Sequence, residues 1–250
     1  TVQPNTVSGA LVLDKVNVAV FKPFFPGLSR LEGELNLAGG LSGPVDSPDF
    51  YGEFNFRNGA LATRDAPVDL DRIGVAAAIR GRQASITGGF HSGDGEAKLD
   101  GRMAWSGTPE LDMHVGGQSL AVRQKPLVNA LIDPDVSVTV KPYQLTVKGK
   151  VEVPEGELQP QALSDKAIPL SADVHVIDQN ANKSRVRVAG AMKQWAVDAD
   201  LDLILGNKVR FKGFGLNSYL NGRLRLQEQP QRGLQATGEI DIDTRADRDA

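Results

Sequence analysis

Three aspartates at alternate positions, Asp198, Asp200 and Asp202, are the residues in this sequence that most resemble a binding site. Carboxylate oxygens are the ligands that calcium and magnesium prefer. On a β-strand, however, alternate residues lie about 6.6 Å apart and point out from the same face, too far apart to enclose one ion. The run therefore predicts the solvated face of a strand, and we expect no metal site.

The remaining polar residues do not form a recognisable catalytic motif. The sequence has three histidines (His91, His114 and His175) and no cysteine, so there is no thiol nucleophile for a histidine to activate. No serine elbow precedes a helix, and Gly213-Phe-Gly215 lacks the third glycine and the acidic partner of a dinucleotide site. We expect no catalytic residue and no cofactor; the protein is not predicted to be an enzyme.

Strands with one apolar and one charged face are predicted throughout the chain. Residues 52–56 read Gly-Glu-Phe-Asn-Phe, residues 149–153 read Gly-Lys-Val-Glu-Val, and residues 238–242 read Gly-Glu-Ile-Asp-Ile. Successive side chains of a strand point to opposite faces, so each segment has an apolar side and a polar side. We expect about fifteen such strands, with Val16–Val20 the first clear one.

Composition limits the classes of partner. The formal net charge is -3 with 28 basic and 31 acidic residues, so there is no basic field to attract nucleic acid. The absence of cysteine is convenient in an oxidising compartment. No apolar run approaches the roughly 18 residues of a membrane-spanning helix. The way the sequence starts and stops is typical of a fragment of a longer chain.

A large two-faced sheet must cover its apolar side. It can pair with a second sheet, close into a barrel, or curl into a trough that a guest fills. Aromatic content is only 6%, which disfavours a thickly packed sandwich, and glycines such as Gly149, Gly190 and Gly213 favour curvature. The prediction is an all-β fold: an elongated, curled, mainly antiparallel sheet forming a β-groove with a hydrophobic interior and one short helix.

The short helix is placed at 124–132, where Leu127, Val128, Leu131 and Ile132 have helical spacing after Pro126. Residues 1–250 are expected to form a single continuous unit, with possible halves at 1–123 and 136–250 on either side of that helix. Asn58-Gly59 predicts a tight turn. The proline-rich stretch 154–169 is expected to be a loop.

The apolar positions of the predicted strands define a candidate groove lining. We expect the following side chains to line it: Leu35, Leu37, Phe54, Phe56, Ile73, Val75, Met103, Trp105, Leu111, Met113, Val138, Val140, Leu145, Val147, Val151, Val153, Val174, Val176, Val186, Val188, Val197, Leu201, Leu203, Leu205, Val209, Phe211, Leu224, Leu226, Ile240 and Ile242.

A longer string in the second half resembles a known family. Residues 208–226 contain Val209-Arg210, then Phe214-Gly-Leu216, then Leu220-Asn-Gly-Arg-Leu224, and the strand Gly238-Glu-Ile-Asp-Ile242 follows. Together with Gly149-Lys-Val-Glu-Val-Pro, this pattern is similar to the C-terminal region of the TamB family of AsmA-like proteins. The similarity spans about residues 126–242.

That resemblance implies a fold called a β-taco, a long bent sheet with a hydrophobic groove, and a place in the periplasm of a Gram-negative cell, with the parent protein anchored in the inner membrane. It implies movement of phospholipids between the inner and outer membranes, with phospholipid acyl chains as partners. It also implies contact with a TamA-type outer-membrane barrel through parts of the parent chain missing here. Two rivals remain open: a scaffold that pairs strands with client outer-membrane proteins, and a passive stalk with a packed interior.

Overall fold

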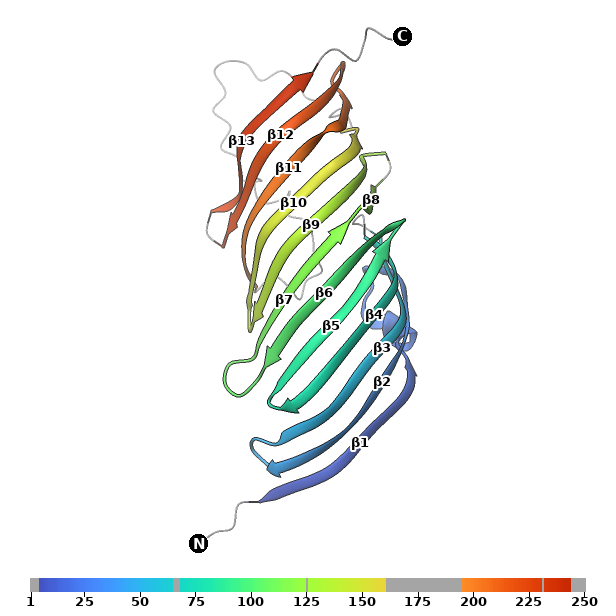
Figure 1. Cartoon of the computed structure of the whole chain (residues 1–250), viewed down its shortest axis with the longest axis vertical. Helices are drawn as coiled ribbons and strands as arrows, with labels where there is room; N and C mark the ends of the chain where they lie inside the picture. The colour runs from blue at the N-terminus through green and yellow to red at the C-terminus, as the bar shows by residue number, and fades with distance from the viewer. Residues whose placement is uncertain (1–4, 65–67, 125, 161–194, 231, 244–250) are drawn as a thin grey trace.

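The computed structural model describes residues 5–64, 68–124, 126–160, 195–230 and 232–243, and nearly all of them belong to one sheet. The chain forms an elongated, open sheet whose strands stack in nearly sequential order, with β1 and β13 at opposite ends of the stack (Figure 1). The strands are β1 (Thr6–Asn17), β2 (Leu28–Pro44), β3 (Asp49–Thr63), β4 (Asp69–Gly81), β5 (Gln83–Ser92), β6 (Gly95–Ala104), β7 (Glu110–Gln118), β8 (Leu120–Gln124), β9 (Val128–Lys141), β10 (Gln144–Leu158), β11 (Ala196–Gly213), β12 (Leu216–Gln229) and β13 (Gly233–Asp243). The predicted all-β, mainly antiparallel fold is confirmed.

One pair of neighbours departs from the antiparallel pattern. Strands β10 and β11 run parallel, from the pair Gln144 and Ala196 to the pair Leu158 and Phe211. Parallel neighbours cannot be joined by a tight turn and need a long connection. The sequence between β10 and β11, residues 159–195, is the longest between consecutive strands, and the predicted lining residues Val174, Val176, Val186 and Val188 in it lie outside the described residues.

The helix predicted at 124–132 is wrong. Strand β8 ends at Gln124 and β9 begins at Val128, and both pair with each other, Leu120 opposite Ile132 and Gln124 opposite Val128. Only nine residues supported the helical spacing, and Leu131 simply occupies the opposite face of β9 from its apolar neighbours. Because β9 lies between β7–β8 and β10, its backbone hydrogen bonds are made on both sides.

The short helix is instead the 3-10 segment η1 (Val18–Phe24), between β1 and β2. The side chain of Asn17 accepts a hydrogen bond from the backbone N–H of Ala19 at 2.9 Å and so caps its first turn. The strand expected at Val16–Val20 therefore ends at Asn17.

Two further local predictions are corrected by strand pairing. Asn58-Gly59 is a bulge inside β3 rather than a hairpin turn: Asn58 has a φ of 53°, and the pairing with β4 shifts between Phe56 and Gly59. The same left-handed conformation serves a turn or a bulge. Pro154 lies within β10 rather than in a loop, at the shift after Val153, where a residue that lacks an N–H donor is tolerated.

The register gives the sheet an apolar face and a polar face, because residues opposite each other on paired strands project to the same side. One line of partners on the apolar face crosses ten strands: Leu13, Leu37, Phe54, Ala77, Ile86, Gly101, Met113, Val138, Val147 and Ala199. The neighbouring line on the polar face consists of Asn36, Asn55, Ala76, Thr87, Asp100, His114, Ser137, Lys148, Asp200 and Gln227.

Candidate functional site

The apolar face is the candidate site, and the register brings the predicted lining residues of successive strands together on it. Leu35 lies opposite Phe56, which lies opposite Val75, near the N-terminal end of the sheet. In the middle, one line of partners is Met103, Leu111, Val140, Leu145 and Val197, and Met113, Val138 and Val147 form the next. At the C-terminal end, the same face carries Val151, Val153, Leu201, Leu203, Leu205, Val209, Phe211, Leu224, Leu226, Ile240 and Ile242.

Trp105 is the described lining residue that does not belong to a strand. It follows the end of β6, and its backbone N–H donates to the carbonyl of Arg82 at 3.0 Å. Ile73, by contrast, lies opposite Gly59 beside the bulge of β3, where the ring of Phe56 covers the glycine.

The sequence reasoning missed part of this face because of the helix prediction. The even-numbered residues of β9 continue it without interruption, and Leu120 and Val122 of β8 lie opposite two of them. Alternation from residue 128 to residue 140 was the signal that could have found them. The residues concerned are Val128, Ala130, Ile132, Pro134 and Val136.

Packing on the apolar face is tightest where β9 to β12 meet. Val153, Leu205, Val209 and Leu220 form a buried cluster, with Val209 only 1% exposed. Partly buried side chains pack against it: Ala130, Ile132, Leu158, Leu203 and Phe211. A core of this size, drawn from one layer of strands, leaves much of the apolar face half-buried rather than sealed.

Glycines in the apolar face allow strands to approach closely. Gly149 has a φ of +145°, a conformation that residues with a Cβ rarely adopt, and a Cβ here would collide with the backbone carbonyl of Asp135 on β9. Gly222 of β12 has the same geometry, at φ +142°, against Glu239 of β13. Both glycines thus adopt a conformation closed to most residues, on the face that otherwise carries large aliphatic side chains. The curvature predicted at Gly149 stays a prediction.

Asp198, Asp200 and Asp202 lie on the polar face, where Asp200 forms an ion pair with Arg225. Arg225 donates two hydrogen bonds to Asp200, at 2.8 and 2.7 Å, and Asp202 lies opposite Arg225 in the register. The hydrogen bonds from Arg225 lower the pKa of Asp200 below its ordinary value of 3.8. Within the described residues, no group of three or more histidine, aspartate or glutamate side chains could hold a metal ion.

Other charged groups of β10 and β11 also pair on the polar face. Lys212 donates to Glu157 at 3.0 Å, and this hydrogen bond lowers the pKa of the Glu157 carboxyl. The hydrogen bond between Lys150 and Glu152, whose atoms are 2.7 Å apart, raises the pKa of Lys150. Of the histidines, His114 lies 3.5 Å from Asp135 and His91 lies 3.9 Å from Glu96, while His175 is outside the described residues.

None of the helices in the described part of the chain has the length and apolar character needed to cross a membrane.

A family model for the TamB C-terminal domain matches residues 83–244, from β5 through β13. The chain belongs to the TamB family. It is also 22% identical over 246 residues to the translocation and assembly module subunit TamB of Haemophilus influenzae, an alignment that covers 94% of this chain. The chain spans only 19% of the length of that relative, so it corresponds to one part of a much longer TamB protein. No solved structure matches it.

Membership of the TamB family agrees with the resemblance drawn from residues 126–242 and extends it. The family match begins at Gln83, so it includes the whole run of strands from β5 to β8 that the sequence string did not reach. The apolar face that continues through β5 to β13 is therefore a feature of the segment that the family model describes.

Proposed function

We propose that this chain is a groove segment of a phospholipid transport protein in the periplasm of a Gram-negative cell, part of a parent protein anchored in the inner membrane. The observation that carries the proposal is the uninterrupted line of uncharged residues across the sheet, from Leu13 on β1 to Ala199 on β11, beside a line of mainly polar and charged residues on the other face. Acyl chains would lie on the apolar face while headgroups stay in water.

The driving force is the burial of apolar area. Removing apolar surface from water is worth about 25 cal/mol per Å², or about 0.8 kcal/mol for each methylene group. Val138, Val147 and Leu203 offer aliphatic surface with no directional contact. Every position along the apolar face stabilises an acyl chain by a similar amount. A lipid can therefore move along this face without being held at one tight binding site, and the face does not distinguish one acyl chain from another.

Site-specific photo-crosslinking in cells tests this function. Val151, Leu203 and Leu224 form one cross-strand line on the apolar face, so photoreactive residues at these positions are expected to give lipid adducts. Matched controls are their neighbours in sequence on the polar face: Glu152, Asp202 and Arg225. Equal labelling of the two sets would contradict the proposal, as would the absence of adducts from both.

Replacing Leu203 by arginine places a charge on the apolar face. We expect lipid movement to fall strongly while the chain stays folded, because Leu203 is only partly buried and packs at the margin of the core cluster. Resistance to a protease would show that the fold is retained. Asp198→Arg, which places the same charge on the polar face of the same strand, is the matched variant and is expected to leave lipid movement unchanged.

Strand pairing with client proteins is the second candidate function, and a specific observation favours it. Among the described strands, β1 pairs only with β2 and β13 only with β12, so each has a sheet edge without a described partner strand. Such edges are templates for an incoming strand. On this reading the chain would act as a scaffold in a translocation and assembly module, together with a TamA-type outer-membrane barrel that other parts of the parent chain contact.

Proline at residue 236, in the middle of β13, separates the two candidates. Ala236 pairs with Leu226, and a proline there removes a backbone donor from the strand at the edge. If strand pairing is primary, the variant loses outer-membrane protein assembly and keeps lipid adducts at Leu203. If lipid transport is primary, lipid movement is retained in Ala236→Pro and falls in Leu203→Arg.

A further inference from the structure

The short helix η1 and the turn after it expose an unusual concentration of large apolar side chains. Val20 is 62% exposed, Phe21 45%, Phe24 76% and Phe25 54%. Three of the nine phenylalanines of the chain thus lie within five residues and largely in solvent. Exposed apolar clusters of this kind mark surfaces that meet a lipid or a partner.

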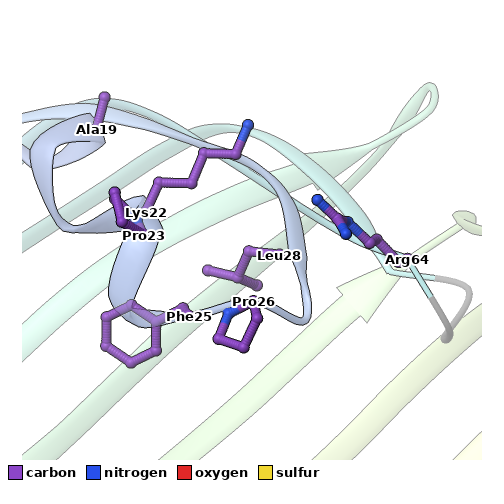
Figure 2. A pocket seen from close by; sticks show the side chains of 7 residues that line it. All are labelled: Ala19, Lys22, Pro23, Phe25, Pro26, Leu28 and Arg64. Carbon is purple, nitrogen blue, oxygen red and sulfur yellow. The ribbon is translucent and has the colours of Figure 1, made fainter.

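A pocket of about 350 Å³ lies beside this helix. Figure 2 shows the long side chains of Lys22 and Arg64 on one side of Leu28 and the rings of Phe25 and Pro26 on the other. The volume is at the small end of the range for ligand sites, so it suits a polar headgroup rather than a whole lipid. Ala19 and Pro23 complete the lining.

Backbone hydrogen bonds fix the loop that forms this pocket. The N–H of Phe25 donates to the carbonyl of Lys22 at 3.0 Å, and the N–H of Leu28 donates to the carbonyl of Phe25 at 2.9 Å. The N–H of Arg64 donates to the carbonyl of Gly27 at 3.1 Å, which ties the loop to the end of β3. Both cationic side chains are therefore carried by backbone that is held in place.

The charge in the pocket is positive and has no partner in the described part of the chain. Neither the Lys22 ammonium nor the Arg64 guanidinium forms an ion pair there. The two acids at the start of the adjacent strand β4 are already paired with other arginines: Asp69 with Arg30 at 2.6 Å and Asp71 with Arg72 at 3.1 Å. An anionic ligand would complement this pair of cations.

The pocket also adjoins the apolar face. Leu28, the first residue of β2, lies opposite Thr63, the last residue of β3, and the next apolar partners inward are Leu31 and Leu61, followed by Leu70 on β4. A molecule with an anionic end at Lys22 and Arg64 and an apolar end on Leu28 would therefore lead directly onto the face proposed to shield acyl chains.

We propose that the η1 pocket binds the phosphate headgroup of a net anionic phospholipid and is a lateral site at which that lipid joins the apolar face. The planar guanidinium of Arg64 can donate two hydrogen bonds to a phosphate, and Lys22 adds a point charge. Phe25, Pro26 and Leu28 contact the glycerol end of the acyl chains. This inference rests on the proposed function, because it assigns an entry point and a headgroup class to the same lipid path.

Titration of the 250-residue chain with short-chain lipids below their micelle concentration tests the headgroup site. Dihexanoyl phosphatidylglycerol is the anionic probe, dihexanoyl phosphatidylcholine the zwitterionic one, and glycerol phosphate the soluble anion; calorimetry measures the affinities. We expect phosphatidylglycerol to bind most tightly and Lys22→Glu and Arg64→Glu each to weaken it about tenfold. Lys98→Glu, the same charge change on the polar face of β6, is the matched control and is expected to leave the affinity unchanged.

Several results would overturn the headgroup site. Equal affinity for the two lipids would contradict charge recognition at η1. An equal loss of affinity for phosphatidylglycerol in Lys22→Glu and Lys98→Glu would contradict it as well. Glycerol phosphate binding as tightly as the lipid would identify a soluble-phosphate site, and Phe25→Ser is then expected to have no effect, whereas the proposal expects it to weaken the lipid alone. If Lys22→Glu does not fold, Lys22→Gln, which only removes the charge, takes its place.

Crosslinking at two positions separates failure of this inference from failure of the proposed function. With photoreactive residues at Leu28 and at Leu203, the proposal expects Arg64→Glu to reduce anionic-lipid adducts at both. If Arg64→Glu does not change the yield of adducts at Leu203, the entry site is contradicted and the lipid path is retained. No adducts at either position in the wild-type background would remove the lipid path and the entry site with it.

Discussion

The two ends of the sheet use the same alternation of residues to different effect. In β9–β12, bulky aliphatic side chains are buried, as at Leu205 and Val209. In β1–β4, Ala60 is the one buried apolar side chain among the described residues, and large ones such as Leu11 and Leu13 are 46% and 38% exposed. Stability in this chain is therefore concentrated in one region, while the other offers apolar surface.

The sizes of facing side chains differ between parts of the two regions. On the apolar face of β3 to β5, large residues stand opposite very small ones: Phe54 lies opposite Ala77, and Val75 lies opposite Gly88. In β10–β12, Val151, Leu203 and Leu224 stand in line and are all of similar size. The buried residues of the core cluster nevertheless stand opposite glycines, Leu205 opposite Gly222 and Val209 opposite Gly156, so burial there comes from side chains of several strands packing together.

Truncating a leucine at each end should give the largest difference. Leu205→Ala removes a side chain that is 8% exposed within the core cluster, and it is expected to cost about 2–5 kcal/mol in the free energy of unfolding. Leu13→Ala, at 38% exposed, is expected to cost under about 1 kcal/mol. Urea denaturation followed by circular dichroism measures both, and equal losses would mean that the two ends are packed alike.

Replacing a glycine at each end is expected to have the next largest effect. Gly149→Ala forces a Cβ into a left-handed backbone conformation and against the carbonyl of Asp135, at an expected cost of about 1–3 kcal/mol. Gly9→Ala, on β1, meets no atom within 4 Å, so its effect on stability should be close to zero or slightly favourable. Thermal unfolding of the two variants measures this difference. A melting temperature unchanged in Gly149→Ala would show that β10 can relax at this position and that the close approach is not needed.

Both faces of the sheet could be predicted from sequence, because the alternation of apolar and polar residues remains readable even where a turn or a helix is predicted wrongly. Leu35, Phe56 and Val75 were assigned to one face from their spacing alone, and the register agrees. Their role in a lipid groove stays a prediction. A strand of period two needs no knowledge of its neighbours for its faces to be assigned.

The features that could not be predicted from the sequence are those that depend on pairing with a neighbouring strand. Asn58-Gly59 has the chemistry of a hairpin turn, and it became a bulge because β4 pairs on both sides of it. The apparent helix at Leu127, Val128, Leu131 and Ile132 is extended because β8 and β10 both pair with β9. The parallel pairing of β10 with β11 likewise has no local signature. The η1 pocket was missed because it depends on Arg64 reaching a loop about 40 residues earlier in the chain.

The smallest expected effect concerns the ion pairs on the polar face of the packed region, and it depends on pH. The pKa of Asp200 is lowered in the folded chain by Arg225, and that of Glu157 is lowered by Lys212. A carboxyl with a lowered folded pKa adds stability above its unfolded pKa and loses it as the pH falls through the folded value. The contribution of Asp200 is therefore fully present at neutral pH and disappears as the pH falls from about 5 to below its ordinary value of 3.8.

Asp200→Asn tests this expectation against a variant from the open end. At pH 7 we expect it to lower the melting temperature slightly, because exposed ion pairs contribute little, and at pH 3 the gap from the wild-type chain should narrow. Asp46→Asn, on the turn between β2 and β3, should leave the melting temperature close to wild type at both values. A gap for Asp200→Asn that stays constant with pH would mean that Arg225 stabilises the packed region through the contacts of its side chain rather than through charge, because packing does not depend on the protonation of a carboxyl.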